Sequence, residues 1–171
     1  MSIPLISKDP SRGLPRFLLR FPVLLYHLGL GWLLGHRFVL LRHTGRKTGL
    51  PRETVLETVR YDKKRSIYII ASGWGANSQW YKNILYNPTV EIQSGCRRMK
   101  GIAERLSEQE AQQELATYAR SHPVAYRELG KRLLGEVVNE GTQGYRKLAK
   151  KIPIIAIRKS TDQKAITDNT V

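Results

Sequence analysis

The chain has 171 residues, of which 41% are apolar, so it is long and apolar enough for one domain with a sizeable core. Its 29 Lys and Arg against 14 Asp and Glu give a net charge of +15, which favours polyanions as partners: nucleic acid, an anionic membrane or a phosphorylated ligand. The single cysteine, Cys96, excludes an internal disulfide and any multi-cysteine metal site; we expect no metal and a cytoplasmic protein.

The most apolar stretch is FPVLLYHLGLGWLLG, residues 21–35. It is shorter than the roughly 20 residues that cross a bilayer, and no small-residue signal cleavage site follows it. Arginines on both sides are typical of helices that lie in the interfacial plane of an anionic membrane. We therefore predict a tail at 1–13 and an amphipathic helix at 14–35. This helix either rests on the inner face of the membrane or packs against the core.

The remaining elements follow from periodicity and turn residues. Strands are predicted at 38–45, 53–61, 66–72 and 152–160, with a hairpin at 89–103. A short helix capped by Asn77 or Ser78 ends before Pro88, and the capping-box pattern SEQE at 107–110 begins a helix that runs to about residue 121. Two further helices are predicted at 123–135 and 143–151.

Short turns between most of the strands indicate an α+β domain around an antiparallel sheet or small barrel, covering residues 14–159. The tail at 160–171 has too few apolar residues to be ordered, so we predict disorder there. No GxGxxG lies between a strand and a helix, and GRKTG shares only its final Lys-Thr with a phosphate-binding P-loop.

The turn RHTGRKTGLPRETV, residues 42–55, places Arg46, Lys47, Thr48 and Arg52 close together. Such a group suits a phosphate, because Arg binds as a fork, Lys as a point charge and Thr as a hydroxyl donor. Glycines on either side allow the backbone to approach a ligand closely. The alternative is a solvated hairpin loop in a basic protein.

TGRKTGLPRET, followed by IIASGWG, then WYKNILYNPTVEIQ and a closing strand IPIIAI, resembles the deazaflavin (F420)-dependent nitroreductase family over roughly residues 14–159. This resemblance implies a split β-barrel of the FMN-binding type, with an N-terminal helix and further helices flanking the barrel. It also implies coenzyme F420 as the cofactor, with FMN as the alternative. The phosphodiester and glutamate tail of F420 would supply the anion.

Carried over by this resemblance, Arg46, Lys47 and Thr48 would face the phosphate and the first carboxylates of the tail. Other residues would contact the ring system, its edge or the rim of the groove: Arg52, Thr54, Val55, Ala71, Ser72, Gly73, Trp80, Tyr81 and Asn83. Trp80 and Tyr81 also suit a purely structural role as core aromatic residues.

The implied reaction is hydride transfer from the reduced deazaflavin to a quinone, enone or nitroaromatic acceptor, with a proton from water or a tyrosine. Tyr126, which follows Pro123, is the nearest tyrosine candidate, and the four histidines are interpreted as packing or surface residues. The alternative function is a non-catalytic barrel that carries a flavin or lipophilic ligand. Nucleic acid is disfavoured because the basic residues are dispersed, and pairing into a homodimer is left open.

Overall fold

The computed structural model describes residues 23–28, 37–73 and 75–160. The tail expected at 1–13, all but the first residue of the tail expected at 160–171, and most of the helix expected at 14–35 lie outside these residues. The predictions for those segments therefore stay predictions.

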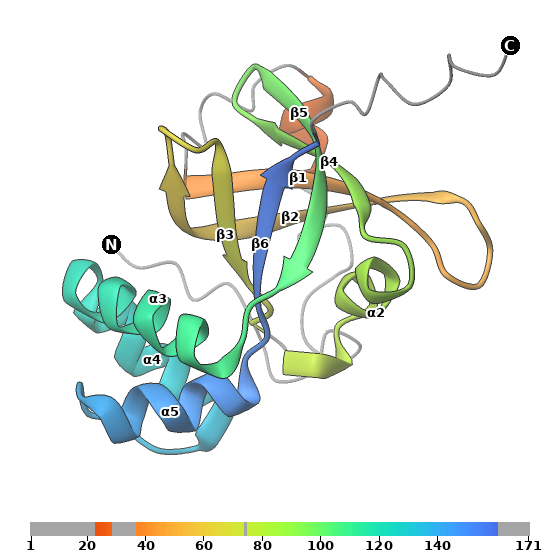
Figure 1. Ribbon diagram of the computed structural model, residues 1–171. Helices are drawn as coiled ribbons and strands as arrows, with labels where there is room; N and C mark the ends of the chain where they lie inside the picture. Colours follow the sequence, from red (N-terminus) through yellow and green to blue (C-terminus); the bar gives the residue numbers. More distant parts are fainter. Residues whose placement is uncertain (1–22, 29–36, 74, 161–171) are drawn as a thin grey trace, which may run out of the picture.

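Six strands form a closed barrel in the order β1-β2-β3-β6-β5-β4 (Figure 1). Every neighbouring pair is antiparallel, and pairing of β1 with β4 closes the barrel. The strands are β1 (Phe38–Thr44), β2 (Pro51–Asp62), β3 (Ile67–Ala71), β4 (Thr89–Ser94), β5 (Arg97–Arg105) and β6 (Ile154–Lys159). This architecture confirms the predicted antiparallel barrel.

The interior of the barrel is filled by alternate residues of its strands. Val39 and Leu41 of β1 point inward, as does Leu56, the register partner of Val39 on β2. Residues that lie opposite each other in an antiparallel pair share a face of the sheet. The register therefore decides which side chains of β1 and β2 face the interior and which face outward.

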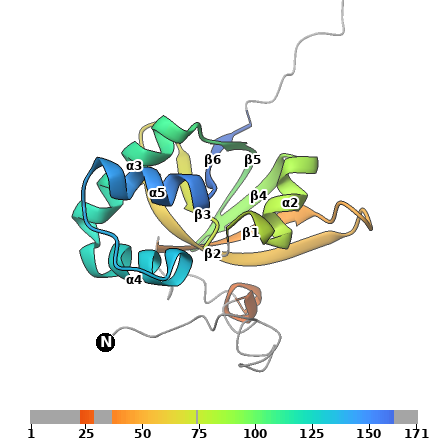
Figure 2. The same cartoon turned by 90° about the horizontal axis from the view of Figure 1, so that it is seen from below.

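The helices lie in two places. Helices α3 (Glu108–Ser121), α4 (Pro123–Leu134) and α5 (Thr142–Lys151) cover one side of the barrel, whereas α2 (Gln79–Tyr86) lies beside the β1–β2 hairpin, preceded by a short 3-10 helix, η2 (Gly75–Asn77) (Figures 1 and 2). The helical layer buries Leu115, Tyr126 and Leu148 against β3 and β6 residues such as Ile69 and Ile154. Because β6 has the barrel interior on one face and this layer on the other, it is a continuous apolar run.

Local signals in the sequence fix several element ends. Ser107 accepts a hydrogen bond from the backbone N–H of Glu110, and the Glu110 carboxylate accepts one from the backbone N–H of Ser107, so the predicted capping box is confirmed. Helix α4 ends at Gly135, which has a left-handed backbone (φ 75°) that suits glycine. Strand β2 begins at Pro51, two residues earlier than predicted, because its pairing with β1 continues to Thr44.

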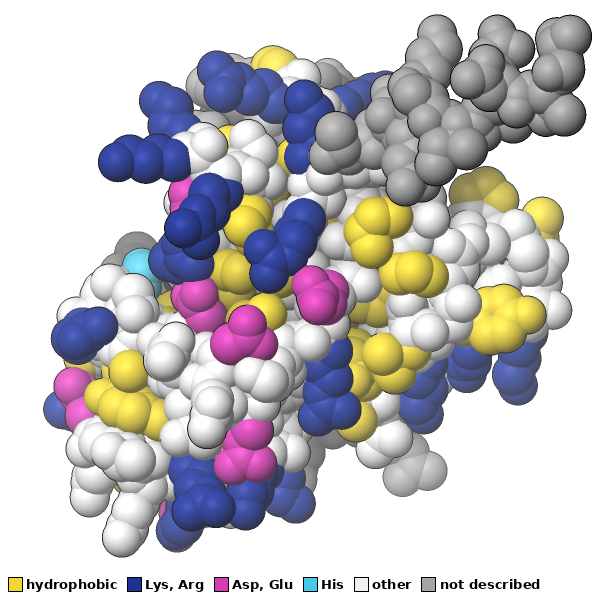
Figure 3. Space-filling view, in the orientation of Figure 1, with side chains coloured by type: hydrophobic (Ala, Val, Ile, Leu, Met, Phe, Trp, Pro, Cys, Tyr) yellow, Lys and Arg dark blue, Asp and Glu magenta, His cyan; other side chains and the backbone are white. Residues whose placement is uncertain are grey.

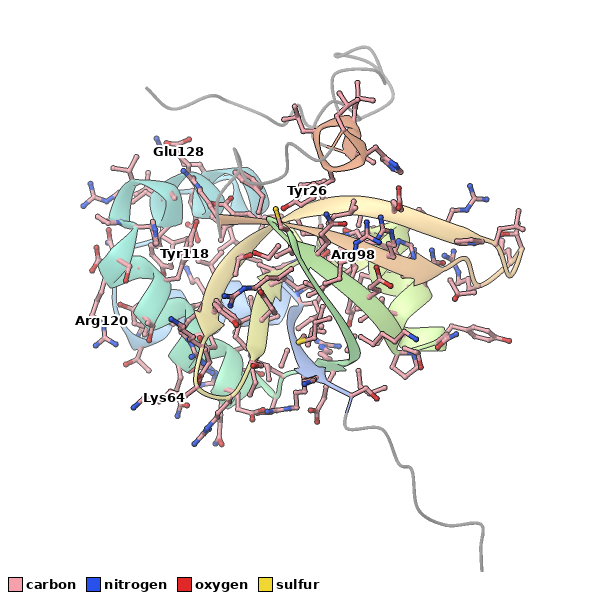
Figure 4. All side chains as sticks on the ribbon, turned by 90° about the horizontal axis from the view of Figure 1, so that it is seen from above. Tyr26, Lys64, Arg98, Tyr118, Arg120 and Glu128 are labelled. Carbon is pink, nitrogen blue, oxygen red and sulfur yellow. The ribbon has the colours of Figure 1, made fainter. Side chains whose placement is uncertain are left out.

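Residues 23–27 form a helical turn on the outside of the barrel. Tyr26 is buried beneath it and donates a hydrogen bond to the Phe38 carbonyl oxygen at 2.7 Å (Figure 4). Leu24 and Leu28 are 43% and 63% exposed, so one side of the turn packs on the barrel and another leaves two leucines exposed. Among the described residues, no helix has the length and apolar character that a membrane crossing requires.

Candidate functional site

The loop between β1 and β2 carries the predicted anion-binding residues on a tight turn. The Gly45 N–H donates to the Leu50 carbonyl oxygen, and the Gly49 N–H donates to the Gly45 carbonyl oxygen, both at 2.8 Å. Gly49 has φ 67°, a left-handed conformation that strains other residues. A Cβ on Gly45 would lie 2.9 Å from Thr48 Oγ1, so both glycines are needed for this turn.

Helix α2 holds Arg46 in place. The Asn83 Oδ1 atom accepts hydrogen bonds from the Arg46 backbone N–H at 3.2 Å and from its Nη1 at 3.0 Å. Arg46 Nη2 donates to Gln79 Oε1 at 3.1 Å. The structure thus brings together two predicted site residues that are distant in sequence, and it adds Gln79, which sequence reasoning missed. The available signal was the spacing of four between Gln79 and Asn83, which places both amides on one helix face.

The cations of this loop have no acidic partner among the residues that the structure describes. In the described part of the chain, Arg46, Lys47 and Arg52 form no ion pair, and Lys47, Thr48 and Arg52 are exposed. Arg37, Arg60 and Arg158, by contrast, each pair with a carboxylate. Three unpaired cations within one turn form a local positive site that favours an anion.

His43 lies behind the loop and contacts the residue that holds Arg46. It is buried, and its Nδ1 lies 3.2 Å from Asn83 Nδ2. Burial lowers the pKa of His43 below its usual value of 6.5, an interaction with the Thr44 backbone partly offsets this, and the charge of Arg52 lowers the pKa further. His43 was interpreted from the sequence as a packing or surface residue. Its contact with Asn83 depends on the tertiary structure, which brings α2 beside β1.

The register divides the predicted residues of β2 between two faces. Arg52 lies opposite His43 and Thr54 lies opposite Leu41, so these two share the inward face that α2 covers. Val55 lies opposite Leu40, on the other face. The structure therefore does not bring the Val55 side chain together with Arg52 and Thr54, because side chains alternate along a strand.

The segment Ala71–Gly73 is joined to the start of α2. The Ser72 hydroxyl donates to the Gly75 carbonyl oxygen at 2.7 Å and shares a hydrogen bond with Ser78 Oγ at 2.7 Å. Ser78 is the residue that precedes α2, but its hydroxyl makes no capping bond to the helix. The space that a Cβ on Gly73 would occupy is open, whereas the Ser72 backbone N–H already donates to the Pro153 carbonyl oxygen at 3.0 Å.

Trp80 and Tyr81 are core residues at the mouth of the barrel. Both are buried in the interior cluster, and their rings meet edge to face with centroids 6.2 Å apart. The Trp80 Nε1–H has no hydrogen-bond acceptor among the described residues. A buried donor without a partner is costly, and this indole is on α2, the helix that also carries Asn83.

Tyr126 lies apart from these residues. It is fully buried in the helical layer, where its hydroxyl donates to the Asn139 carbonyl oxygen at 3.5 Å and its ring contacts Tyr145. Burial raises the pKa of Tyr126 to about 12, with smaller contributions from Tyr145 and Glu140. The structure does not bring this predicted catalytic residue to the loop, because α4 packs on the opposite side of the barrel from α2 (Figure 2).

On the face of the molecule seen in Figure 3, the charged side chains do not form a single patch of one sign. Lys and Arg side chains lie in separate groups over the face seen in Figure 3, with acidic side chains between some of them. Among the described residues, no group of His, Cys, Asp and Glu side chains could hold a metal ion.

Comparison with known proteins places this geometry in a class and then in a family. Two solved structures share the fold: an F420-H2 dependent reductase (FDR-A), with TM-score 0.51 and 22% identity over 72% of this chain and 96% of that one, and a pyridoxamine 5'-phosphate oxidase-related, FMN binding protein from Nostoc punctiforme, with TM-score 0.50 and 13% identity over 82% and 80%. The chain is therefore a split barrel of the FMN-binding type.

The profile of the F420H2-dependent quinone reductase family matches residues 28–138, so the chain belongs to that family. An F420H2-dependent quinone reductase of Mycobacterium tuberculosis is 36% identical over 103 residues, which are 53% of this chain and 66% of the relative. The matched part of the chain includes the β1–β2 loop and α2 but ends before α5 and β6.

Proposed function

We propose that this chain binds reduced coenzyme F420 and catalyses the transfer of a hydride from it to a quinone, with enones and nitroaromatics as further acceptors. The observation that carries the proposal is the group formed by Arg46, Lys47 and Arg52 at the tip of the β1–β2 hairpin, which form no ion pair within the described part of the chain. Family membership supports the same cofactor, whose phosphodiester and glutamate carboxylates match these donors in charge.

The residues present fit such a cofactor. Guanidinium and ammonium groups on an open turn can receive an extended anionic tail, because each can pair with a different phosphate or carboxylate oxygen. The first turn of α2 has no side-chain cap, so its backbone N–H groups add donors beside Arg46. The first backbone N–H groups of α2 and the Trp80 Nε1–H are hydrogen-bond donors that the oxygen atoms of a ring system could satisfy.

The cofactor, when bound, would supply a hydride, and the protein needs to hold the donor and acceptor together and exclude water. Arg46 and Asn83 would orient the tail, while the apolar residues of α2 would shield one side of the ring. Reduction of a quinone by a hydride also consumes a proton. We propose that water supplies it, because Tyr126 is buried in the helical layer and its raised pKa disfavours the phenolate.

Titration of the purified chain with F420 and, in parallel, with FMN tests this proposal. We expect F420 to bind more tightly than FMN and reduced F420 to be oxidised when a naphthoquinone is added. Preference for FMN, or binding without turnover, would instead support the alternative of a barrel that carries a flavin or lipophilic ligand. Binding to neither would contradict the placement of a cofactor on this loop.

We also propose that the N-terminal segment brings the barrel to the inner surface of an anionic membrane. Support comes from the exposed Leu24 and Leu28, on a turn whose other side is fixed to the barrel by Tyr26 and His27. Deletion of residues 1–20 should reduce sedimentation with anionic vesicles, and high salt should mimic that loss. If neither the deletion nor high salt changes sedimentation with the vesicles, the proposal of membrane binding is contradicted.

Pairing of two chains stays a prediction as well. Sedimentation equilibrium with and without F420 would decide whether a second copy is present when the cofactor binds.

A further inference from the structure

We propose that His43 is a positioning residue for the cofactor site: its Nδ1 accepts a hydrogen bond from the Asn83 amide and so turns the Asn83 carbonyl oxygen toward Arg46. Sequence reasoning treated His43 as a packing or surface residue, and nothing in the proposed reaction uses it. The inference rests on the proposed function only where it concerns cofactor binding, because the hydrogen bonds among His43, Asn83 and Arg46 are present without cofactor.

The chemistry of the three groups determines the direction of each hydrogen bond. Arg46 has donors and no acceptor, so the Asn83 atom that faces its backbone N–H and Nη1 must be the oxygen. The amide nitrogen of Asn83 then faces His43 and can only donate. His43 Nδ1 must therefore be an acceptor, which requires a neutral ring that carries its proton on Nε2.

Protonation of His43 would break this arrangement. A proton on Nδ1 would face the Asn83 N–H group, donor against donor, and the amide would have to rotate and present its nitrogen to Arg46. Arg46 would then lose both bonds to Asn83 and keep only the one to Gln79. A less restrained guanidinium costs more entropy to order on a ligand, so the cofactor should bind more weakly.

The surroundings of His43 favour the neutral ring. Arg52 lies opposite His43 on β2, Arg46 reaches the same amide from the loop, and α2 presents the neutral Asn83. Both charged neighbours are cations, and in the described part of the chain no carboxylate pairs with the ring. Burial and the charge of Arg52 lower the pKa of His43, and the hydrogen bond with the Thr44 backbone offsets only part of this lowering. The acceptor is thus available at neutral pH and is lost in acid.

Two substitutions separate the acceptor from the packing of the ring. His43→Leu fills similar space but has no acceptor, whereas His43→Asn retains an oxygen near the position of Nδ1. We expect the Kd for F420 at pH 7.5 to rise about tenfold in the Leu variant and to change less than about threefold in the Asn variant. Thermal unfolding of both variants provides the check on folding. Equal weakening in both, or none in either, would overturn the proposal.

The pH dependence of binding gives a second readout. The ratio of the Kd of the native chain to that of His43→Asn cancels the titration of the ligand and of the loop. We expect this ratio to rise as the pH falls below 6.5, because only the native chain loses its acceptor. A ratio that stays constant over the pH range in which nitrogen-15 NMR shows the His43 ring becoming protonated would contradict the proposed role.

A measurement without cofactor keeps this inference separate from the proposed function. Nitrogen-15 NMR of the histidine rings at pH 7.5 should show His43 as the neutral tautomer with its proton on Nε2. A proton on Nδ1 would overturn the assignment, whether or not F420 binds. If that tautomer is present and the native chain fails to bind F420, the proposed function fails and the hydrogen-bond arrangement stands.

Discussion

The β1–β2 hairpin contains arginines of two kinds, which differ in whether a carboxylate binds them. On the outer face of the barrel, Arg42 lies between Glu53 of β2 and Glu91 of β4, with distances of 2.7 Å and 2.6 Å to their carboxylates. At the tip, only a few residues away, Arg46 is held by amide oxygens and Arg52 has no acidic partner in the described part of the chain. The same side-chain type thus joins strands in one place and belongs to the proposed anion site in the other.

The groups that a cation contacts indicate its role better than its position in the sequence does. A guanidinium whose donors already bind two carboxylates has little left for a ligand. One that is fixed by neutral oxygens keeps its full charge and is already oriented. Four predictions test this contrast, and the first concerns the strongest effect on binding.

Removal of two cations at the tip should have the largest effect on binding. In Lys47→Ala combined with Arg52→Ala, we expect F420 binding to weaken by about 2 to 4 kcal/mol, since charged hydrogen bonds contribute about 1.5 to 3 each and add incompletely. Stability should change little, because both side chains are exposed. Calorimetric titration provides the measurement, and unchanged affinity would refute the placement of the site.

Removal of the paired arginine should affect stability instead. Arg42→Met leaves Glu53 and Glu91 without their shared cation, and we expect the free energy of unfolding to fall by about 1 to 3 kcal/mol with F420 affinity unchanged. Urea denaturation measures the first quantity and titration the second. A loss of affinity equal to that of the tip variant would erase the distinction between the two groups.

The pH dependence of stability also tests the role of the Arg42–Glu53 ion pair. Burial raises the pKa of Glu53, but hydrogen bonds from Arg42 and His27 lower it by more, so the net pKa is below the usual 4.5. Its contribution to stability is therefore present at neutral pH and is lost as the pH falls below 4.5 through the folded-state value. Arg42→Met should show a smaller loss over this range in urea denaturation, and an identical acid profile would contradict the role of the pair.

Substitution of Gly49 tests the backbone of the tip. Gly49→Ala introduces a Cβ at φ 67°, which should cost about 1 kcal/mol of stability even though the space around this Cα is open. A strained turn should also weaken F420 binding, by less than the double variant.

Arg158→Ala, which removes an exposed arginine paired with Glu104, is the matched control and should change stability by less than about 0.5 kcal/mol and affinity not at all.

Local patterns predicted most elements because their causes lie within a few residues. The capping box at Ser107 and Glu110 starts α3, Pro88 follows the end of α2, and glycines shape the β1–β2 turn. The motif resemblance was also accessible, since GRKTG and WYKN are contiguous segments, and family membership is confirmed.

The elements, the charge of the loop and the family could be predicted from the sequence, because these depend on short-range sterics, hydrogen bonding and local residue types. The position of β6 between β3 and β5, the orientation of Val55 away from Arg52 and the burial of Tyr126 in the helical layer follow from tertiary packing. The tertiary structure also decided that Asn83 joins His43 to Arg46. These contacts span tens of residues and depend on strand register and packing, in which a shift of one residue reverses which side chains meet.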